Sequence, residues 1–391
     1  MLEVDERVDP ATPPGEPPGR RRRGLGRFLL SGDGWPYALL PFIPLAVVLE
    51  FAHANASLIF FSSAIGVIPT AALMGKATEE LAERAGPGIG GLLNVTFGNF
   101  PELLIAFFAL THGLHEVVKA SVIGSVLGNV LLVLGGSMLV GGIRRDRQLF
   151  NQRAASSQAI MLILAMAALT MPAVFQLVDG GELPQPGAEL VSFSHPVEEL
   201  SLAVAIVLLV AYAGGLWFSL KSHRGLFNPE EEAEIGHETW SVRKSVMLLA
   251  IAGLAVGLMS EILVGSIAET AESVGLSEFF IGAVIVAVVG NAAEHWVAVY
   301  VAAKDKMDLA INIAVGSAAQ VALFVGPLLV VLSFFVGPGP LALVFNGFEL
   351  AAVLLAVIIA SHVTNQGEST WFEGLMLLSL YAVLVAAFFF A

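Results

Sequence analysis

Eleven stretches of this sequence are apolar over about 17–25 residues each, the length that an α-helix needs to cross a lipid bilayer. Only 13% of the 391 residues are charged and the mean hydropathy is +0.81, whereas about 25% of residues are charged in soluble domains. The predicted fold class is therefore all-α, a polytopic membrane protein with eleven transmembrane helices that has the lipid bilayer as its surroundings. The predicted spans are 36–52, 57–75, 88–111, 117–141, 155–177, 199–220, 244–266, 279–303, 308–335, 341–361 and 371–390.

Other features of the composition exclude several classes of protein. The chain has no Cys, which excludes disulfides and Cys-ligated zinc. The formal charge of −14 disfavours a nucleic-acid partner, and the absence of a GxxxxGK[ST] loop disfavours an ATP-driven pump. Residues 1–30 are acidic, then rich in Pro and Gly, then basic, which predicts a disordered cytoplasmic tail rather than a signal peptide. No enzymatic activity and no prosthetic group are predicted.

The basic residues predict the orientation, because Lys and Arg concentrate in cytoplasmic loops. With a cytoplasmic N-terminus and eleven spans, all of the 19 Lys and Arg residues except Lys119 fall on the cytoplasmic side. The C-terminus is then extracytoplasmic.

The two halves of the chain resemble each other at an offset of 192 residues, without a gap. This offset contains five predicted spans, an odd number, so the two copies cross the membrane in opposite directions, as in inverted-repeat transporters. The predicted organisation is 1+5+5: an extra helix at 36–52, a first repeat at 57–220, an acidic cytoplasmic segment at 221–243 and a second repeat at 244–390. The aligned pairs include Thr78 with Thr270, Glu80 with Glu272, Gly98 with Gly290, Asn99 with Asn291, Glu102 with Glu294, Gly124 with Gly316 and Ser125 with Ser317.

Each repeat contains one Gly-Asn-x-x-Glu motif within an apolar span. The motif residues are Gly98, Asn99 and Glu102 in the first repeat and Gly290, Asn291 and Glu294 in the second. Asn and Glu at this spacing lie on one helical face. The glycines weaken the helix and Pro101 removes a backbone hydrogen bond, which frees carbonyl oxygens to face a ligand in a cavity. Such an all-oxygen set is typical of a site for a hard cation such as Ca²⁺.

A buried carboxylate can also serve a purely structural ion pair. However, no Lys or Arg lies near the middle of any predicted span, so Glu102 and Glu294 need a bound cation, a proton, or each in turn. Two carboxylates that share one site titrate as a coupled pair. The sequence therefore favours a site that exchanges protons for a cation, with Glu102, Glu294 and the adjacent His295 as the proton-coupling candidates.

Weaker candidates follow each motif on the next helix. Ser125, Ser317, Asn129 and Gln320 either add oxygen ligands to the site or provide small and polar packing surfaces, and both interpretations stay open. His295 is either a pH sensor or a histidine that hydrogen-bonds a neighbouring helix. Carboxylates also lie towards the span ends, and most of them are expected to be solvated, with a role in guiding ions to the mouths of the site as the alternative. They are Glu79, Glu80 and Glu83 on one side and Glu261, Glu269 and Glu272 on the other.

The segment between the repeats is strongly acidic. Its carboxylates include Glu230, Glu231, Glu232 and Glu234. They form either a solvated linker or a cytoplasmic element that senses cations or takes part in gating.

Three stretches resemble the cation/proton exchanger family, the Ca²⁺/H⁺ antiporters of the Ca²⁺/cation antiporter superfamily. They are GKATEELAERAGPGIGGLLNVTFGN (75–99), SEILVGSIAETAESVGLSEFFIGAVIVAVVGNAAEH (260–295) and AVGSAAQVALFVGP (314–327). The resemblance extends from about Pro36 to Phe390. It implies that Glu102 and Glu294 carry Ca²⁺ and protons, flanked by Asn99 and Asn291, with Ser125, Ser317 and Gln320 nearby.

The resemblance further implies export of cytosolic Ca²⁺ in exchange for H⁺ across the cytoplasmic membrane of a prokaryote. Alternating access would come from a gating pair of spans that slides against a core. This pair is the first span with the seventh, or with the second, which is the repeat mate of the seventh. The first motif reads GNFPE, and its Pro-Glu resembles the related Na⁺/Ca²⁺ exchangers. Three alternatives therefore stay open: exchange of Na⁺ for Ca²⁺, exchange of Na⁺ or K⁺ for H⁺, and transport of Mn²⁺. Assembly into a homo-oligomer also stays open. A channel and an intramembrane hydrolase are disfavoured, the latter because HExxH spacing and a paired nucleophile are missing.

Overall fold

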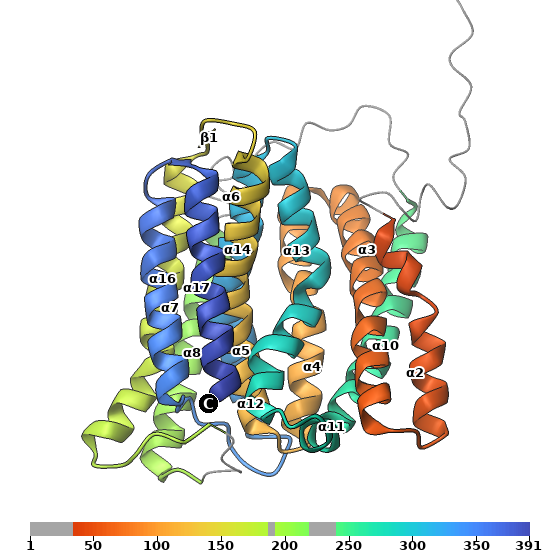
Figure 1. The fold of residues 1–391 in the computed structure, drawn as a ribbon, viewed down its shortest axis with the longest axis vertical. Helices are drawn as coiled ribbons and strands as arrows, with labels where there is room; N and C mark the ends of the chain where they lie inside the picture. Colours follow the sequence, from red (N-terminus) through yellow and green to blue (C-terminus); the bar gives the residue numbers. More distant parts are fainter. Residues whose placement is uncertain (1–33, 187–191, 219–239) are drawn as a thin grey trace, which may run out of the picture.

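A computed structural model of the protein describes residues 34–186, 192–218 and 240–391, and Figure 1 shows them as one bundle of helices. Two short strands, β1 (Gln148–Leu149) and β2 (Glu368–Ser369), pair antiparallel at one end. The helices are η1 (Trp35–Leu39), α2 (Phe42–Phe51), α3 (Ala56–Gly98), α4 (Phe100–Thr111), α5 (His115–Leu127), η2 (Gly128–Val133), α6 (Leu134–Gly142), α7 (Gln152–Val178), α8 (His195–Trp217), α10 (Val242–Gly265), α11 (Ile267–Val274), α12 (Glu278–Phe280), η4 (Ile281–Val286), α13 (Ala287–Ala303), α14 (Met307–Gln320), η5 (Val321–Val325), α15 (Gly326–Ser333), α16 (Gly347–Thr364) and α17 (Trp371–Phe390).

The prediction of an all-α, multi-pass membrane protein is confirmed. Within the described residues, 9 helical runs are long and apolar enough to cross a membrane, and a bent pair of helices, Leu92–Gly98 with Phe100–Thr111, raises the number to 10. The predicted first span corresponds to a shorter apolar helix, Trp35–Phe51. The count of eleven spans therefore stays a prediction. The tail at residues 1–30 lies outside the described residues.

The tenth predicted span differs from the structure at its start. The span is predicted over 341–361, but α16 begins at Gly347, and residues 341–346 form a buried, non-helical segment. The helix begins there because Asn346 and Glu349 form a capping box: the Asn346 side chain accepts from the Glu349 backbone N–H, and the Glu349 side chain accepts from the Asn346 backbone N–H. Apolar composition alone cannot distinguish a buried irregular segment from the first turn of a helix.

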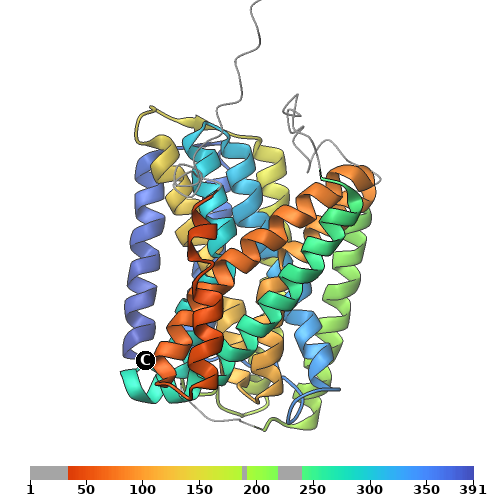
Figure 2. The same cartoon turned by 90° about the vertical axis from the view of Figure 1, so that its right-hand side faces the viewer.

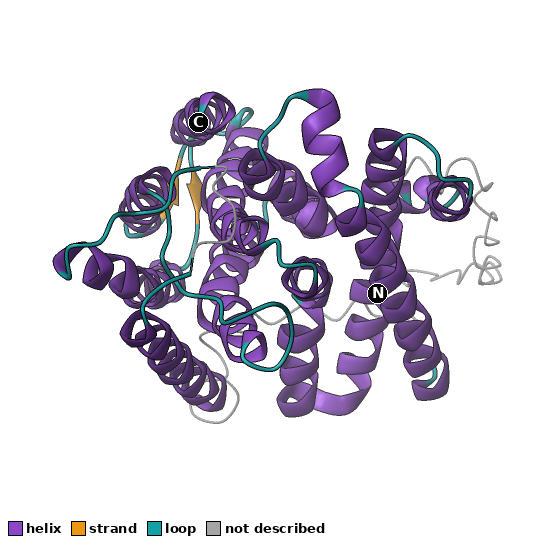
Figure 3. Ribbon diagram, turned by 90° about the horizontal axis from the view of Figure 1, so that it is seen from below, coloured by secondary structure: helices purple, strands orange, loops and turns teal. Residues whose placement is uncertain are grey.

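The basic residues gather at one end of the bundle. The strand pair β1–β2, seen from below in Figure 3, ties the loop before α7 to the loop before α17, with Arg147 3.0 Å from Glu368. Nearby, Arg145 lies 3.1 Å from Asp305 in the turn between α13 and α14. The helical run His115–Gly142 ends close to these arginines, and Lys119 lies near its other end, at the start of α5. This distribution agrees with the predicted orientation, which itself stays a prediction.

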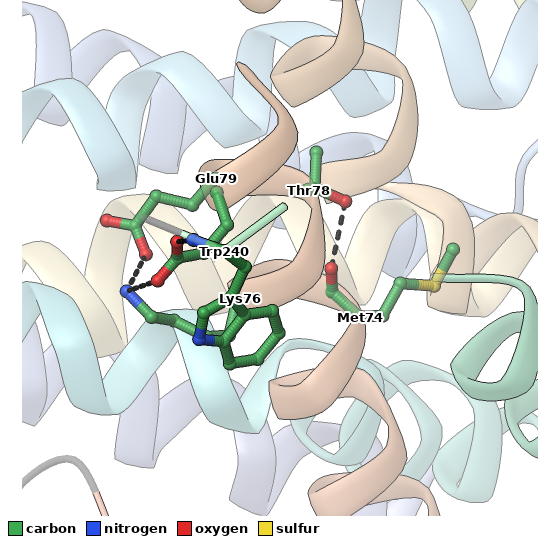
Figure 4. A network of polar contacts seen from close by, with 6 residues as sticks. Met74, Lys76, Thr78, Glu79 and Trp240 are labelled. Atoms are coloured by element: carbon green, nitrogen blue, oxygen red, sulfur yellow. Dashed lines mark hydrogen bonds and ion pairs between the residues drawn. The ribbon is translucent and has the colours of Figure 1, made fainter. Parts of the chain in front are cut away.

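Helices α3 and α10 lie side by side and run obliquely across the bundle (Figure 2). Glu80 on α3 was expected to be solvated, but it is only 8% exposed because Trp240, just before α10, covers it. Its carboxylate accepts the Trp240 backbone N–H at 2.7 Å, and Lys76 lies 3.4 Å from it. Figure 4 shows Lys76 and Trp240 of this network. The prediction for Glu80 is therefore wrong, and its carboxylate joins the two helices instead.

Three segments within the described spans are π-helical. Two of them, η2 and η5, occupy nearly equivalent positions in the repeats, because residues 128–133 shifted by 192 become 320–325 and η5 covers Val321–Val325. The third, η4, immediately precedes α13. Since π-helical turns occur frequently at functional sites, their position beside the two motifs agrees with a functional role for this region.

Candidate ion-binding site

The first motif lies at a break between two helices. Helix α3 ends at Gly98, Asn99 has φ −91° and ψ 10°, and α4 begins at Phe100 at an angle of 43° to the preceding helical segment. Pro101 lies in the first turn of α4, where its missing N–H has no partner to lose. The predicted interruption at this motif is confirmed, and it places Glu102 in the first turn of α4.

The second motif differs from this expectation. Helix α13 runs without interruption from Ala287 to Ala303, so Gly290 does not break it. The Asn291 amide nitrogen donates to the carbonyl oxygen of Ala287 at 2.9 Å, one turn earlier in the same helix. The prediction that both motifs free backbone carbonyls is therefore wrong for the second copy, because Gly alone costs a helix only about 1 kcal/mol whereas Pro removes a hydrogen bond.

The two motifs face each other across the bundle. A Cβ atom added to Gly98 would lie 3.4 Å from Oε1 of Glu294, and one added to Gly290 would lie 3.3 Å from Cγ of Glu102. Each glycine thus provides the surface against which the glutamate of the other repeat packs. This reciprocal contact is what a pseudo-twofold relation between the repeats produces.

The electrostatic environment of the two glutamates is unusual. Glu102 is 9% exposed, and its Oε2 atom has no hydrogen-bond partner. The two carboxylates are close enough to repel each other electrostatically. Among the described residues, no Lys, Arg or His forms an ion pair with either carboxylate. Glu102 is buried and Glu294 is half-buried, and two adjacent negative charges without a counter-charge in such a site are strongly unfavourable, so this pair requires a proton or a cation.

Neutral polar groups from both repeats surround the pair. Ser317 on α14 donates to Oε2 of Glu294 at 3.0 Å. The amide nitrogen of Asn99 donates to Oε1 of Gln320 at 2.5 Å, and that of Asn291 donates to the Ser125 hydroxyl at 3.2 Å. The structure therefore brings together most of the residues predicted from the sequence, on α3–α4, α5, α13 and α14.

Two predicted residues are less directly involved. Asn129 is fully buried in η2, and its side chain forms no hydrogen bond with the other site residues. His295 faces η2: a Cβ atom on Gly128 would lie 3.8 Å from its Cε1, and its buried Nε2 has no partner. The acidic residues Glu230, Glu231, Glu232 and Glu234 lie outside the described residues, so their role stays a prediction.

Four further polar residues of the interior were not predicted as site residues from the sequence. Gln158 on α7 donates to the Asn312 side chain on α14, five residues before Ser317. Lys119, the one basic residue predicted to be extracytoplasmic, and Glu349 both line a cavity near one end of the bundle. At the equivalent positions of the first repeat, Asn312 corresponds to Ala120 and Glu349 corresponds to Ser157. The available signal was their polarity within otherwise apolar spans.

Curated proteins of similar sequence cover nearly the whole chain. The chain is 41% identical over 371 residues to a Ca²⁺/H⁺ antiporter of Aphanothece halophytica, which covers 90% of this chain and 96% of that protein. It is 42% identical over 351 residues to the Ca²⁺/H⁺ antiporter ChaA of Bacillus subtilis, with 89% and 96% covered.

Solved structures of the same fold agree with this. The structure of native YfkE superposes with a TM-score of 0.77 at 38% identity, over 91% of this chain and all of that one. The structure of the H⁺/Ca²⁺ exchanger CAX has a TM-score of 0.68 at 16% identity over 92% of each chain, a likeness in fold alone. The sequence profile of the sodium/calcium exchanger proteins matches residues 55–221 and 244–390. The chain therefore belongs to the sodium/calcium exchanger protein family.

Proposed function

We propose that this protein is a secondary active transporter that exports cytosolic Ca²⁺ in exchange for H⁺. The observation that carries the proposal is the pair Glu102 and Glu294, which belong to opposite repeats, repel each other and have no basic partner among the described residues. The names of the relatives from Aphanothece halophytica and Bacillus subtilis support the same pair of ions.

The chemistry of exchange follows from the charge of the pair. A divalent cation neutralises both carboxylates, and protons neutralise them equally well, but both cannot occupy the same oxygens at once. Binding of Ca²⁺ therefore requires loss of protons, and protonation releases Ca²⁺. Two unneutralised negative charges have a high electrostatic energy in a low-dielectric interior. The site therefore changes its access from one side of the membrane to the other only when Ca²⁺ or protons are bound, which is the condition for antiport.

The remaining ligands are oxygens around these two carboxylates. We assign the amide oxygens of Asn99 and Asn291 and the backbone at Gly98 and Gly290 to the Ca²⁺ site. Ser125, Ser317 and Gln320 hold the side chains of Asn291, Glu294 and Asn99 in position. Ca²⁺ takes six to eight oxygens, so water completes this set.

Orientation and movement complete the proposal. The basic end of the bundle faces the cytoplasm, and the protein lies in the cytoplasmic membrane, as expected from its bacterial relatives. Helices α3 and α10, which lie obliquely against the other helices, provide alternating access by sliding against them.

Transport by purified protein in liposomes tests the function. We expect a proton gradient alone to drive ⁴⁵Ca²⁺ uptake into acid-loaded vesicles, and a protonophore with the membrane potential clamped to abolish it. Uptake that requires internal Na⁺ would instead establish Na⁺/Ca²⁺ exchange, in agreement with the Pro-Glu of the first motif. Flux of Ca²⁺ without any counter-ion would contradict antiport and indicate a channel.

The variant Ser317→Ala tests the placement of Glu294. Without the hydroxyl, the carboxylate loses the hydrogen bond at 3.0 Å, and hydrogen bonds to charged groups contribute ~1.5–3 kcal/mol. We expect the apparent Ca²⁺ affinity to fall by roughly tenfold or more while the protein remains folded, as measured by ⁴⁵Ca²⁺ uptake against Ca²⁺ concentration. Ser379→Ala on α17, whose hydroxyl donates only to the backbone of its own helix, is the control and should leave the affinity unchanged.

A further inference from the structure

A cavity lies away from the glutamate pair, at the end of the bundle opposite to β1. Its volume is about 360 Å³, which is room for several ordered waters. The ionisable side chains that line it come from three helices: His115, Glu116 and Lys119 on α5, Glu278 on α12 and Glu349 on α16. Three carboxylates against one ammonium give the cavity an excess of negative charge, which concentrates protons and other cations.

Glu349 has one oxygen free within this cavity. The residue is 2% exposed; its Oε2 accepts the backbone N–H of Asn346 at 2.8 Å, and its Oε1 has no hydrogen-bond partner. A buried carboxylate oxygen without a partner is costly unless water or a proton satisfies it. The adjacent cavity provides that water, so Glu349 is in a position to exchange protons with the solution on this side.

Lys119 lines the same cavity. It is 9% exposed, its ammonium donates to the carbonyl oxygen of Val344 at 2.8 Å, and it interacts electrostatically with Glu349. Val344 belongs to the buried irregular segment that precedes α16. The groups that face Glu349 are Lys119, Glu116 and His115 from α5 and Glu278 from α12. The helices α7 and α17, which also pack against α16, contribute no side chain to the cavity lining.

A second, much smaller cavity of about 10 Å³ lies at the ion site. It is lined by Glu102 together with Ser121, Val122 and Ser125 of α5. Helix α5 thus lines both cavities, and Val122 lies only three residues after Lys119, about 4.5 Å along the helix axis. A volume of this size holds about one water, which lies beside Glu102.

We infer that Glu349, with Lys119 as its counter-ion, receives protons from the extracytoplasmic solution and passes them towards Glu102. This inference rests on the proposed H⁺-coupled transport. Lys119 favours the ionised form of Glu349 between transfers, and the proton leaves Glu349 for water on the way to Glu102, so the carboxylate is restored.

The hydration of the cavity is tested without any transport. Because the chain has no Cys, a single introduced Cys reports on its own surroundings. Ala342 lines the cavity and is 3% exposed, whereas Ala352 is 2% exposed and lies outside the cavity lining. In intact cells, we expect a membrane-impermeant thiol reagent to label Ala342→Cys but not Ala352→Cys. Protection of both positions would overturn the inference.

Transport measurements then test the proton route. In membrane vesicles of known orientation, we expect Glu349→Gln, which retains the capping oxygen, to lower H⁺-driven Ca²⁺ flux about tenfold, since a positioned proton-transfer group contributes at least this much. The half-saturating cytoplasmic Ca²⁺ concentration should stay unchanged. Lys119→Met should shift the dependence on extracytoplasmic pH towards higher pH, because Glu349 then accepts a proton more readily. The exposed Glu199→Gln on α8 is the control.

The two proposals fail in distinguishable ways. Normal H⁺-driven flux in the wild type, combined with an unchanged pH profile in both Glu349→Gln and Lys119→Met, would overturn the proton route alone. Absence of H⁺-driven flux in the wild type would overturn the proposed function and this route with it. If Lys119→Met fails to fold, the double variant Lys119→Met, Glu349→Gln removes the unpaired charge and should show the flux of Glu349→Gln.

Discussion

Replacement of Glu102 or of Glu294 with Gln is expected to abolish Ca²⁺ exchange. Each substitution preserves the volume of the side chain but removes one of the two charges that the described residues leave uncompensated. With only one carboxylate, one positive charge of a bound Ca²⁺ stays uncompensated, and leaving a buried charge unpaired costs ~3–5 kcal/mol, where ~1.4 kcal/mol is a factor of ten. The rate of ⁴⁵Ca²⁺ uptake at a fixed Ca²⁺ concentration should therefore fall by at least ~100-fold in either variant.

The pH dependence of binding provides an independent measurement. In the wild type, the apparent Ca²⁺ affinity should decrease as the pH falls, because protons compete with Ca²⁺ for the same oxygens. In Glu102→Gln and Glu294→Gln this dependence should become shallower, since only one carboxylate remains to titrate. Glu368→Gln, at an exposed ion pair with Arg147, is the matched control and should retain wild-type transport. Wild-type rates in Glu102→Gln or Glu294→Gln would remove that residue from the ion path.

The largest effect on stability is expected from the addition of one methyl group, in the variant Gly124→Ala. Helix α5 approaches η4 so closely that a Cβ atom on Gly124 would lie 2.0 Å from the carbonyl oxygen of Ala283 and 2.8 Å from its Cα. Backbone atoms cannot rotate away as a side chain does, so the two helices must separate. Such overpacking costs ~1–3 kcal/mol or more, and the melting temperature in detergent should fall by several degrees.

A glycine with free space around it is the control for Gly124. Gly253 on α10 has nothing within 4 Å of its Cβ position, so Gly253→Ala should leave the melting temperature unchanged or raise it, because Ala is the better helix former. Equal stability of Gly124→Ala and the wild type would mean that α5 and η4 separate at little cost, which would contradict the packing described above.

The fold class and the central residues follow from the sequence alone. Apolar stretches of membrane-spanning length are a local property of the chain, and the repeat at an offset of 192 residues pairs Glu102 with Glu294 without any knowledge of contacts. Pro101 likewise predicts a break at the first motif, because Pro removes a backbone hydrogen bond from a helix interior, although Pro172 lies inside α7 without ending it.

The details of the site depended on tertiary contacts. Ser317 donates to Glu294, a contact that helical periodicity does not predict. Asn99 donates to Gln320, which is 221 residues away in the chain. The second motif stays helical because Gly290 only weakens a helix that its neighbours support. In each case the decisive partner is distant in the sequence, and only packing determines which distant residues meet.

Glu349 shows this division most clearly. Its sequence surroundings predict the interior of a span, yet in the structure it caps a helix beginning only two residues earlier and lines a cavity with Lys119, which is 230 residues away in the chain. The sequence by itself determined that this is a multi-pass protein built from two repeats, each with one intramembrane glutamate. Only the tertiary structure decided which other charges share the interior with them, because a buried charge depends on partners that the folded chain brings together.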